Sequence, residues 1–272
     1  MCAYLRNIKF VLLAGCLFMT QSIAVAVGAV QAEQDKVRLR VVFNNLPYKA
    51  GLKTGWGFAC LIDGLDKVVL FDTGGNGDIL LSNMRQLGLD AEAVDAVVLS
   101  HIHGDHTGGL DTFLARNPDV TVYMPESFPA SFQREVMRLG ATVETVAGPG
   151  QLLDNVYSTG EMNHGIKEQA LFVDTSRGLV VITGCAHPDV ADMAQQAQAY
   201  LGKNIYLLMG GFHMGGRSVA EIRATIKRLQ ALGVKKVAPS HCTGDTAIRL
   251  FREAWQDDFI DGGLGAVIEV PR

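Results

Sequence analysis

The sequence has few histidines and cysteines and no excess of positive charge. Its 272 residues include seven histidines and five cysteines, and 24 basic residues are outnumbered by 28 acidic ones. A chain without a strongly basic balance lacks the electrostatic footprint of a nucleic-acid-binding protein, so we expect no nucleic-acid partner. The absence of helical or propeller repeats excludes solenoid and propeller architectures.

Acidic residues are absent from residues 1–32, and this segment has the pattern of an export signal. Arg6 and Lys9 supply a positive start, and an apolar run begins at Phe10. Val30-Gln31-Ala32 fits the small-residue pattern that precedes a cleavage site. We therefore expect residues 1–32 to be a signal peptide.

Two alternatives to a cleaved signal remain open. Leu13-Ala14-Gly15-Cys16 resembles the lipobox of bacterial lipoproteins, in which Cys16 carries the lipid, although the chain stays apolar as far as Val30. The apolar stretch is also long enough for an uncleaved membrane anchor. After cleavage, residues 33–272 would form one exported domain, periplasmic or secreted and free of the membrane.

Only three cysteines remain outside the signal: Cys60, Cys185 and Cys242. An odd number at this low density excludes a disulfide framework and permits at most one bridge in an oxidising compartment. Cys60 lies inside an apolar run and is predicted to be a core residue. The remaining 22 basic and 28 acidic residues make this part of the chain acidic.

Short apolar runs alternate with amphipathic segments, which predicts an α/β domain of sheets covered by helices. In the helix expected over Val219–Leu232, the residues Val219, Ile222, Ile226 and Leu229 form one apolar stripe. The expected strands are Val37–Phe43, Phe58–Asp63, Val68–Phe71, Ala96–Leu99, Val120–Met124, Leu171–Asp174, Leu179–Thr183, Ile205–Met209, Val234–Ala238 and Ala266–Val270. The other expected helices are Asp78–Leu87, Leu110–Asn117, Ser131–Leu139, Val190–Leu201 and Thr246–Trp255.

Six of the seven histidines lie just past the end of an apolar run, where ligands bind in α/β sheets. The seventh, His164, falls in a segment of weak pattern and is expected to be a solvated or capping loop residue. The polar residues that follow expected strands are Asp72, His101, Cys185, His187, His213 and His241.

The stretch HIHGDH, residues 101–106, places four metal-ligand side chains within six residues. In an extended segment His101 and His103 point the same way and can hold one ion. Gly104 would permit a sharp change of direction, after which Asp105 and His106 can face a second ion.

Here the residues carry a family resemblance. SHIHGDHTGGL resembles the signature of the metallo-β-lactamase superfamily, and LFDTGG resembles its first motif, with the Asp72 carboxylate supporting the histidine loop. GCAHP, GGFHM and PSHCTGD resemble the later motifs, in particular those of the branch named for 7,8-dihydropterin-6-methyl-4-(β-D-ribofuranosyl)aminobenzene-5′-phosphate synthase. The resemblance runs from about Val37 to Val270 and implies a four-layer αββα sandwich with a metal site at one edge of two sheets.

The resemblance also implies two divalent metal ions, expected to be zinc, with manganese or iron as alternatives. Three protein ligands for each ion leave positions open for water, which is typical of a catalytic site. The implied ligands are His101, His103 and His187 for the first ion and Asp105, His106 and His241 for the second.

One dipeptide departs from the superfamily pattern. Most of its hydrolases have Gly-Asp where this chain has Gly184-Cys185, and that aspartate bridges the ions. Cys185 is either a thiolate ligand, which suits zinc better than manganese, a small buried residue, or the partner of Cys242 in a redox or disulfide role. We favour the buried residue, which leaves the bridge to solvent.

His213 also keeps several roles open. We favour a substrate-facing role, as a general acid or as the group that binds a phosphate or carboxylate, over a metal ligand or a structural histidine. Asp105 would both ligate an ion and orient the attacking water. Arg217 and Lys203 are expected to be surface charges, with contact to an anionic substrate as the alternative.

The sequence therefore predicts an exported metal-dependent hydrolase. A metal-activated water would attack an ester, lactone or phosphoester of a small, anionic substrate. The alternatives are a synthase that acts on a phosphorylated pterin-type substrate, and a non-catalytic protein that binds metal or another ligand.

Overall fold

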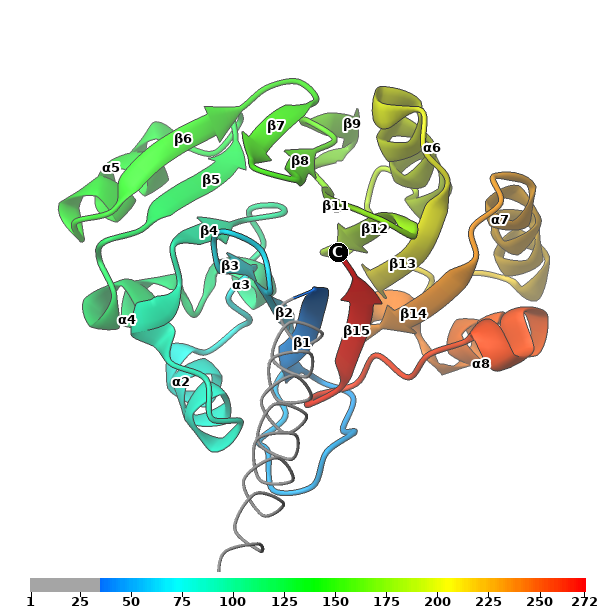
Figure 1. Ribbon diagram of the computed structural model, residues 1–272, viewed down its shortest axis with the longest axis horizontal. Helices are drawn as coiled ribbons and strands as arrows, with labels where there is room; N and C mark the ends of the chain where they lie inside the picture. The colour runs from blue at the N-terminus through cyan, green and yellow to red at the C-terminus, as the bar shows by residue number, and fades with distance from the viewer. Residues whose placement is uncertain (1–34) are drawn as a thin grey trace, which may run out of the picture. The chain divides into compact units, whose positions relative to one another are not determined.

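The computed structural model describes residues 35–272 apart from the side chain of His164, so the predicted signal peptide and Cys16 lie outside the described residues. Two sheets dominate this part of the chain (Figure 1). The first sheet contains β1 (Lys36–Asn44), β2 (Phe58–Asp63), β3 (Val69–Phe71), β4 (Ala96–Val98), β5 (Thr121–Pro125), β6 (Thr142–Val146) and β15 (Val267–Pro271). The second contains β7 (Gly150–Leu153), β8 (Val156–Ser158), β11 (Leu171–Thr175), β12 (Gly178–Thr183), β13 (Ile205–Gly211) and β14 (Lys236–Ser240).

The strand order is β15-β1-β2-β3-β4-β5-β6 in the first sheet and β14-β13-β12-β11-β8-β7 in the second. β9 (Met162–His164) and β10 (Ile166–Glu168) form a separate antiparallel ribbon. The helices are α2 (Gly77–Gln86), α3 (Gly104–Thr107), α4 (Leu110–Arg116), α5 (Ala130–Arg138), α6 (Val190–Leu201), α7 (Val219–Ala231) and α8 (Asp245–Trp255). Short 3₁₀ turns are η1 (Ala91–Ala93), η2 (His241–Thr243) and η3 (Gln256–Asp258).

Alternation along the strands creates three apolar layers. Cys60 of β2 and Ile182 of β12 belong to one cluster between the sheets. Leu61 of β2 points the other way, into a cluster with α2, α4 and α5, and Val181 of β12 points into a cluster with α6, α7 and α8. This arrangement confirms the predicted four-layer αββα sandwich, and Cys60 is a fully buried core residue as expected.

Parallel pairing aligns the ends of the strands that matter for the site. β3, β4, β5 and β6 are mutually parallel, and so are β12, β13 and β14. Their carboxyl ends therefore deliver several loops to the same edge of the sandwich. Across residues 35–272, no helix is both long and apolar enough to span a bilayer.

Several expected elements were misplaced or missed. β14 begins at Lys236 rather than Val234 and runs to Ser240. Its backbone pairs with β13 from Leu207↔Lys236 to Gly211↔Ser240, and this pairing does not depend on whether the last side chain is polar. His164, expected in a loop, pairs through its backbone with Ile166. Strands β6 to β10 were not predicted, because strands of three to five residues are too short to show a continuous apolar run.

Two local expectations also need correction. Val219 is 46% exposed, while Ile222, Ile226 and Leu229 are buried, so the apolar stripe of α7 starts one turn later than predicted. Gly104 has no left-handed backbone conformation and opens the one-turn helix α3, which turns the chain after His103. The change of direction therefore does not require glycine at this position.

Candidate metal centre

Each of five strands is followed, within three residues, by a polar side chain that the sequence analysis named as a candidate site residue. Asp72 follows β3, His101 follows β4, Cys185 follows β12, His213 follows β13, and His241 follows β14. Asp72, His213 and His241 have positive φ angles of 56°, 48° and 51°. Non-glycine residues uncommonly adopt this conformation, and those that do tend to cluster at active sites and ligand-binding positions.

The first group of potential ligands comprises His101, His103 and His187, whose ligand atoms lie within 4.8 Å of one another. The Ser100 hydroxyl donates a hydrogen bond to Asp72 at 2.7 Å and lies 2.9 Å from Nδ1 of His101. The Ser100 oxygen therefore accepts a hydrogen bond from Nδ1–H of His101. Nε2 of His101 is buried and has no hydrogen-bond partner within residues 35–272, so this nitrogen is available to a cation.

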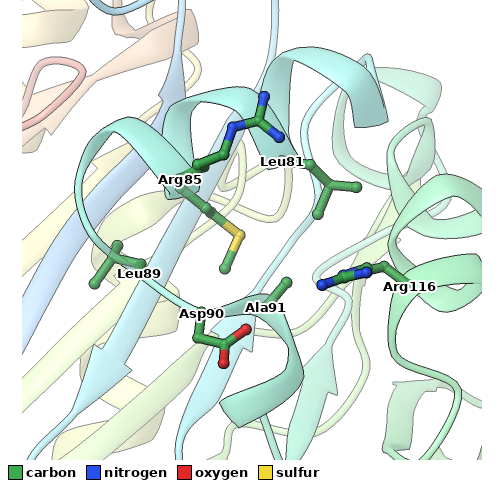
Figure 2. Close-up of a pocket in the computed structure, with 7 residues that line it drawn as sticks. Leu81, Arg85, Leu89, Asp90, Ala91 and Arg116 are labelled. Carbon is green, nitrogen blue, oxygen red and sulfur yellow. The ribbon is translucent and has the colours of Figure 1, made fainter.

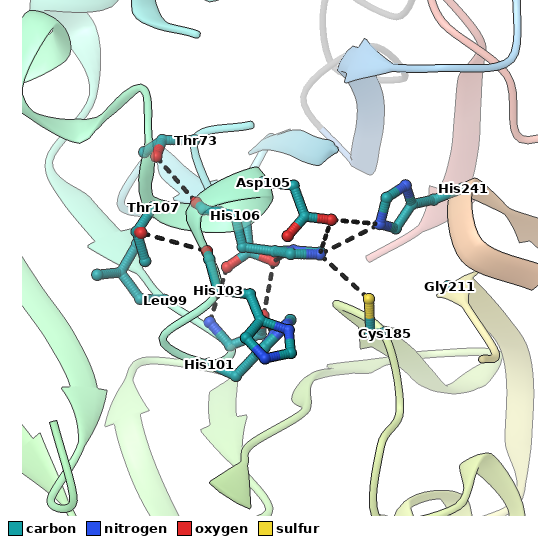
Figure 3. A network of polar contacts seen from close by, with 12 residues as sticks. Thr73, Leu99, His101, His103, Asp105, His106, Thr107, Cys185, Gly211 and His241 are labelled. Carbon is teal, nitrogen blue, oxygen red and sulfur yellow. Dashed lines mark hydrogen bonds and ion pairs between the residues drawn. The ribbon is translucent and has the colours of Figure 1, made fainter. Parts of the chain in front are cut away.

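The second group contains Asp105, His106, Cys185 and His241, again within 4.8 Å of one another (Figure 3). Nε2 of His106 lies 3.2 Å from both Nε2 of His241 and Sγ of Cys185. Oδ2 of Asp105 lies 3.2 Å from Nε2 of His241 and 3.6 Å from Nε2 of His106. The structure thus brings together all six predicted ligands, in the two groups expected, and adds Cys185 to the second.

The histidine rings are oriented through Nδ1. For four of the five predicted histidine ligands an oxygen lies at Nδ1, which leaves Nε2 to ligate a cation, the usual arrangement of metal-ligating histidines. This geometry confirms that Asp72 supports the histidine loop. The pairs are His106 with Asp72 at 2.7 Å, His187 with Glu168 at 2.8 Å and His241 with Asn45 at 2.8 Å.

Glu168 is the functional residue that the sequence reasoning missed. Its carboxylate is fully buried and accepts hydrogen bonds from the backbone N–H groups of Cys185, Ala186 and His187 as well as from the His187 ring. Burial opposes its ionisation, but the His187 ring and these donors hold the pKa well below the usual range. The only sequence signal was an acidic residue two positions before the apolar run that starts at Ala170.

The electrostatics of the centre favour unprotonated ligands. Burial lowers the pKa of His101 to about 3 and that of His106 to about 4, so both rings are neutral at neutral pH, as metal binding requires. Burial opposes ionisation of Asp105, yet its hydrogen bond with His241 keeps the pKa below the usual range. Burial raises the pKa of Asp72 to about 7, so its ionised form relies on the donors around it.

Cys185 and Cys242 lie next to each other at the end of the second sheet. Both are free thiols, and Sγ of Cys242 lies 3.6 Å from the backbone oxygen of Cys185. The hydrogen bond with Cys242 and then burial raise the pKa of Cys185. Cys185 is buried as expected, but its sulfur faces His106 rather than an apolar layer.

His213 lies at the exposed rim of the centre. Its ring centroid is 4.4 Å from that of His187, and its ligand atom lies within 4.8 Å of those of Cys185 and His187. A hydrogen bond with Cys242 raises the pKa of His213, and the charge of the exposed Arg217 acts in the opposite direction. Lys203 pairs with Asp174 at 2.6 Å and does not belong to this cluster.

A separate pocket lies on the helical side of the first sheet (Figure 2). One of its two arginines, Arg116, is already paired with Glu92 at 2.9 Å. None of the clustered histidines contributes to it, so it is not part of the candidate metal centre. Its lining residues are Leu81, Met84, Arg85, Leu89, Asp90, Ala91 and Arg116.

The sequence is similar to those of known proteins. Residues 57–191 match the sequence model of the metallo-beta-lactamase superfamily, a range that contains five of the six predicted ligands. The 7,8-dihydropterin-6-methyl-4-(beta-D-ribofuranosyl)-aminobenzene-5'-phosphate synthase of Methanocaldococcus jannaschii is 29% identical over 252 residues, which cover 76% of this chain and 86% of that protein.

Solved structures show the same architecture. Tm1679, described as a metal-dependent hydrolase of the beta-lactamase superfamily, superposes with a TM-score of 0.75 at 28% identity, over 87% of this chain and all of that one. The short form of human tRNase Z superposes with a TM-score of 0.61 over 86% of this chain and all of the other. At 15% identity, this second likeness shows the fold alone.

Proposed function

Because the chain belongs to the metallo-beta-lactamase superfamily, we propose that it is a metal-dependent hydrolase of an ester, lactone or phosphoester. The observation that carries the proposal is the buried Nε2 of His101, which lacks a partner in the described part of the chain and lies beside two further histidines. The proposed ligands are His101, His103 and His187 for one ion and Asp105, His106 and His241 for a second.

The residues of the centre have distinct tasks in this proposal. Divalent ions, for which zinc is our first choice and manganese or iron the alternatives, lower the pKa of water and polarise the substrate oxygen. Asp105, held in its ionised form, accepts a hydrogen bond from the attacking water and orients it. His213 and Arg217, both exposed, bind the anionic group of a small substrate from the rim.

Turnover of a chromogenic panel tests the hydrolase. The panel holds phosphodiester, lactone and β-lactam substrates, and the zinc-loaded protein should hydrolyse at least one of them. EDTA should abolish the activity, and His103→Ala should lose metal and most activity while it stays folded, because His103 is only half buried. Full metal occupancy in His103→Ala would contradict the assignment. Tightly bound metal without EDTA-sensitive turnover would instead favour the non-catalytic binding protein.

A synthase that acts on a phosphorylated pterin-type substrate is the second candidate. The observation that favours it is the 29% identity to the archaeal synthase over 76% of this chain. Consumption of a phosphorylated pterin-type substrate by the metal-loaded protein, without hydrolysis of the panel, would select this candidate.

Export would also distinguish the two candidates, because a synthase that acts on a cytosolic pterin substrate would not need an export signal. We propose that residues 1–32 are removed and that residues 33–272 function outside the cytoplasm. The periplasmic protein should begin at Glu33 when its N-terminus is sequenced. A lipid on Cys16 would show lipoprotein processing, and an intact N-terminus in the cytosolic fraction would contradict export.

A further inference from the structure

The loop between β1 and β2, residues 45–57, is held in place at its middle and at its end. The side chain of Asn83 in α2 accepts from the backbone N–H of Lys53 and donates to the Lys53 carbonyl oxygen, both at 2.9 Å. Gly57 lies so close to the histidine loop that a Cβ atom there would come within 2.1 Å of the Asp105 backbone oxygen. The conformation of this loop is therefore tied to that of the metal centre.

The same loop contributes two side chains to the surroundings of His241. Oδ1 of Asn45 lies 2.8 Å from Nδ1 of His241 and orients the ring. The indole of Trp56 lies against the same imidazole, with ring centroids 4.9 Å apart and planes tilted by 55°. Trp56 is 61% exposed, the largest exposed fraction among the bulky apolar side chains of residues 35–272. A flat apolar surface therefore borders the second group of ligands and stays open to water.

An indole in this position has apolar surface left to bury. Covering apolar surface is favourable, and an aromatic side chain gains further from offset stacking on another ring. Small-molecule sites are lined mainly by apolar and aromatic side chains, with a few polar groups that fix the orientation of the ligand. The ligands of this centre supply the polar groups, and Trp56 supplies an aromatic surface beside them. A molecule bound to the second group of ligands would lie within reach of this indole.

We propose that Trp56 determines the specificity of the centre by stacking on an aromatic ring of the substrate, next to the bond that is hydrolysed. The inference rests on the hydrolase proposed above and narrows its substrates to esters, lactones or phosphoesters that carry an aryl group. An aromatic ring is favoured over an aliphatic ring of similar size, because only the aromatic ring has a face that stacks on the indole.

Binding of two phosphonates to the zinc-loaded protein tests the inference without turnover. Phenylphosphonate and cyclohexylphosphonate carry the same anionic group on rings of similar size, and their P–C bonds resist hydrolysis. We expect phenylphosphonate to bind about 2- to 10-fold more tightly. It should also shift the tryptophan emission to shorter wavelength. Trp255, the other tryptophan of the chain, is buried, so this shift reports on Trp56.

Trp56→Leu keeps an apolar side chain but removes the aromatic face. In calorimetry this variant should bind both phosphonates equally, while Trp56→Phe should retain a preference for the aromatic one. For a nitrophenyl phosphodiester of the chromogenic panel, Trp56→Leu should raise KM and leave kcat nearly unchanged. Tyr48→Leu is the matched control. Tyr48 belongs to the same loop and is 58% exposed, but it packs against Gly263, so its replacement should change none of these values.

Failure of phenylphosphonate to bind, equal affinity of the wild-type protein for the two phosphonates, or an unchanged preference in Trp56→Leu would overturn the inference. An emission shift that grows with protein concentration alone would also overturn it, because a second copy of the chain would then cover Trp56. Turnover of the panel without any preference for the aromatic ring would leave the hydrolase proposal standing. A preference for phenylphosphonate without turnover would support the role of Trp56 and count against the hydrolase.

Discussion

A neutral histidine has one N–H group, and the acceptor that takes it decides where the other nitrogen can act. Asp72, Glu168 and Asn45 each hold one Nδ1 in this protein, and the Ser100 hydroxyl holds that of His101. These acceptors come from four segments far apart in the sequence. The orientation of these rings is therefore set by the surroundings before any ion binds.

Among these acceptors, Glu168 accepts four hydrogen bonds, so its replacement should have a large effect. Glu168→Gln keeps one oxygen where the carboxylate accepted four hydrogen bonds, so some of the donors lose their partner. We expect metal affinity to fall by about 10–100-fold, as is typical when the partner of a ligand is removed. The free energy of unfolding of the metal-free protein should fall by roughly 1–3 kcal/mol. Zinc titration against a competing chelator and urea denaturation measure the two effects.

Glu161→Gln is the matched control for this change. Glu161 lies seven residues earlier and binds Lys167 at 2.7 Å and the Ser127 backbone at 2.8 Å, away from the centre. Its replacement should leave zinc affinity unchanged. Equal zinc affinity in both variants and the wild type would show that Glu168 does not position His187.

At the scale of elements, the site depends on how closely two loops approach. The loop after β12 meets the loop after β4 at Gly184, where a Cβ atom would lie 2.1 Å from Ser100 Oγ and 3.0 Å from Asp72 Oδ2. Gly57, before β2, approaches the backbone oxygen of Asp105 as closely, and its φ angle is 137°. Side chains at these positions would push the ligand loops apart.

Gly184→Ala should therefore disturb the centre through the backbone. We expect it to destabilise the protein by about 1–3 kcal/mol, as overpacking does, and to weaken metal binding. Gly104→Ala, inside the histidine motif itself, should change stability by no more than about 0.5 kcal/mol, because nothing lies within 4 Å of the added Cβ. Thermal unfolding and zinc titration of both variants measure these effects. A larger destabilisation by Gly104→Ala than by Gly184→Ala would refute the packing argument.

The elements themselves were predictable where one face or both faces are apolar. Phe58–Asp63 and Val190–Leu201 were predicted with the bounds that the structure shows. β6 was missed because its sequence, TVETV, is largely exposed and owes its conformation to pairing with β5. The helix α3 was missed because a four-residue turn leaves no periodic pattern to detect.

At the scale of the whole molecule, each proposed metal position joins the two sheets. His101 and His103 follow β4 of the first sheet, and His187 follows β12 of the second. The other position combines Asp105 and His106 with His241 in the same way. Bound ions would therefore crosslink the two halves of the sandwich through their ligands.

Metal removal should consequently lower thermal stability. At a free metal concentration of 100 times Kd, each site adds about 2.7 kcal/mol, which corresponds to roughly 5–10 °C in Tm for a domain of this size. Thermal unfolding with and without EDTA measures the shift, and His103→Ala should show a smaller one. An unchanged Tm on chelation of the loaded protein would argue against ions shared between the sheets.

The sequence by itself determined the α/β class and four of the potential ligands, because apolar strands and the dense HIHGDH motif are local patterns. The family resemblance added His187 and His241, which lie far from that motif in the sequence. It also singled out Cys185 as the departure from the expected Gly-Asp. Only the tertiary structure placed Sγ of Cys185 3.2 Å from His106 and revealed Glu168 beneath His187. Those contacts join residues 79 and 19 positions apart. Burial and pairing across such separations follow from packing of the two sheets, which no local pattern encodes.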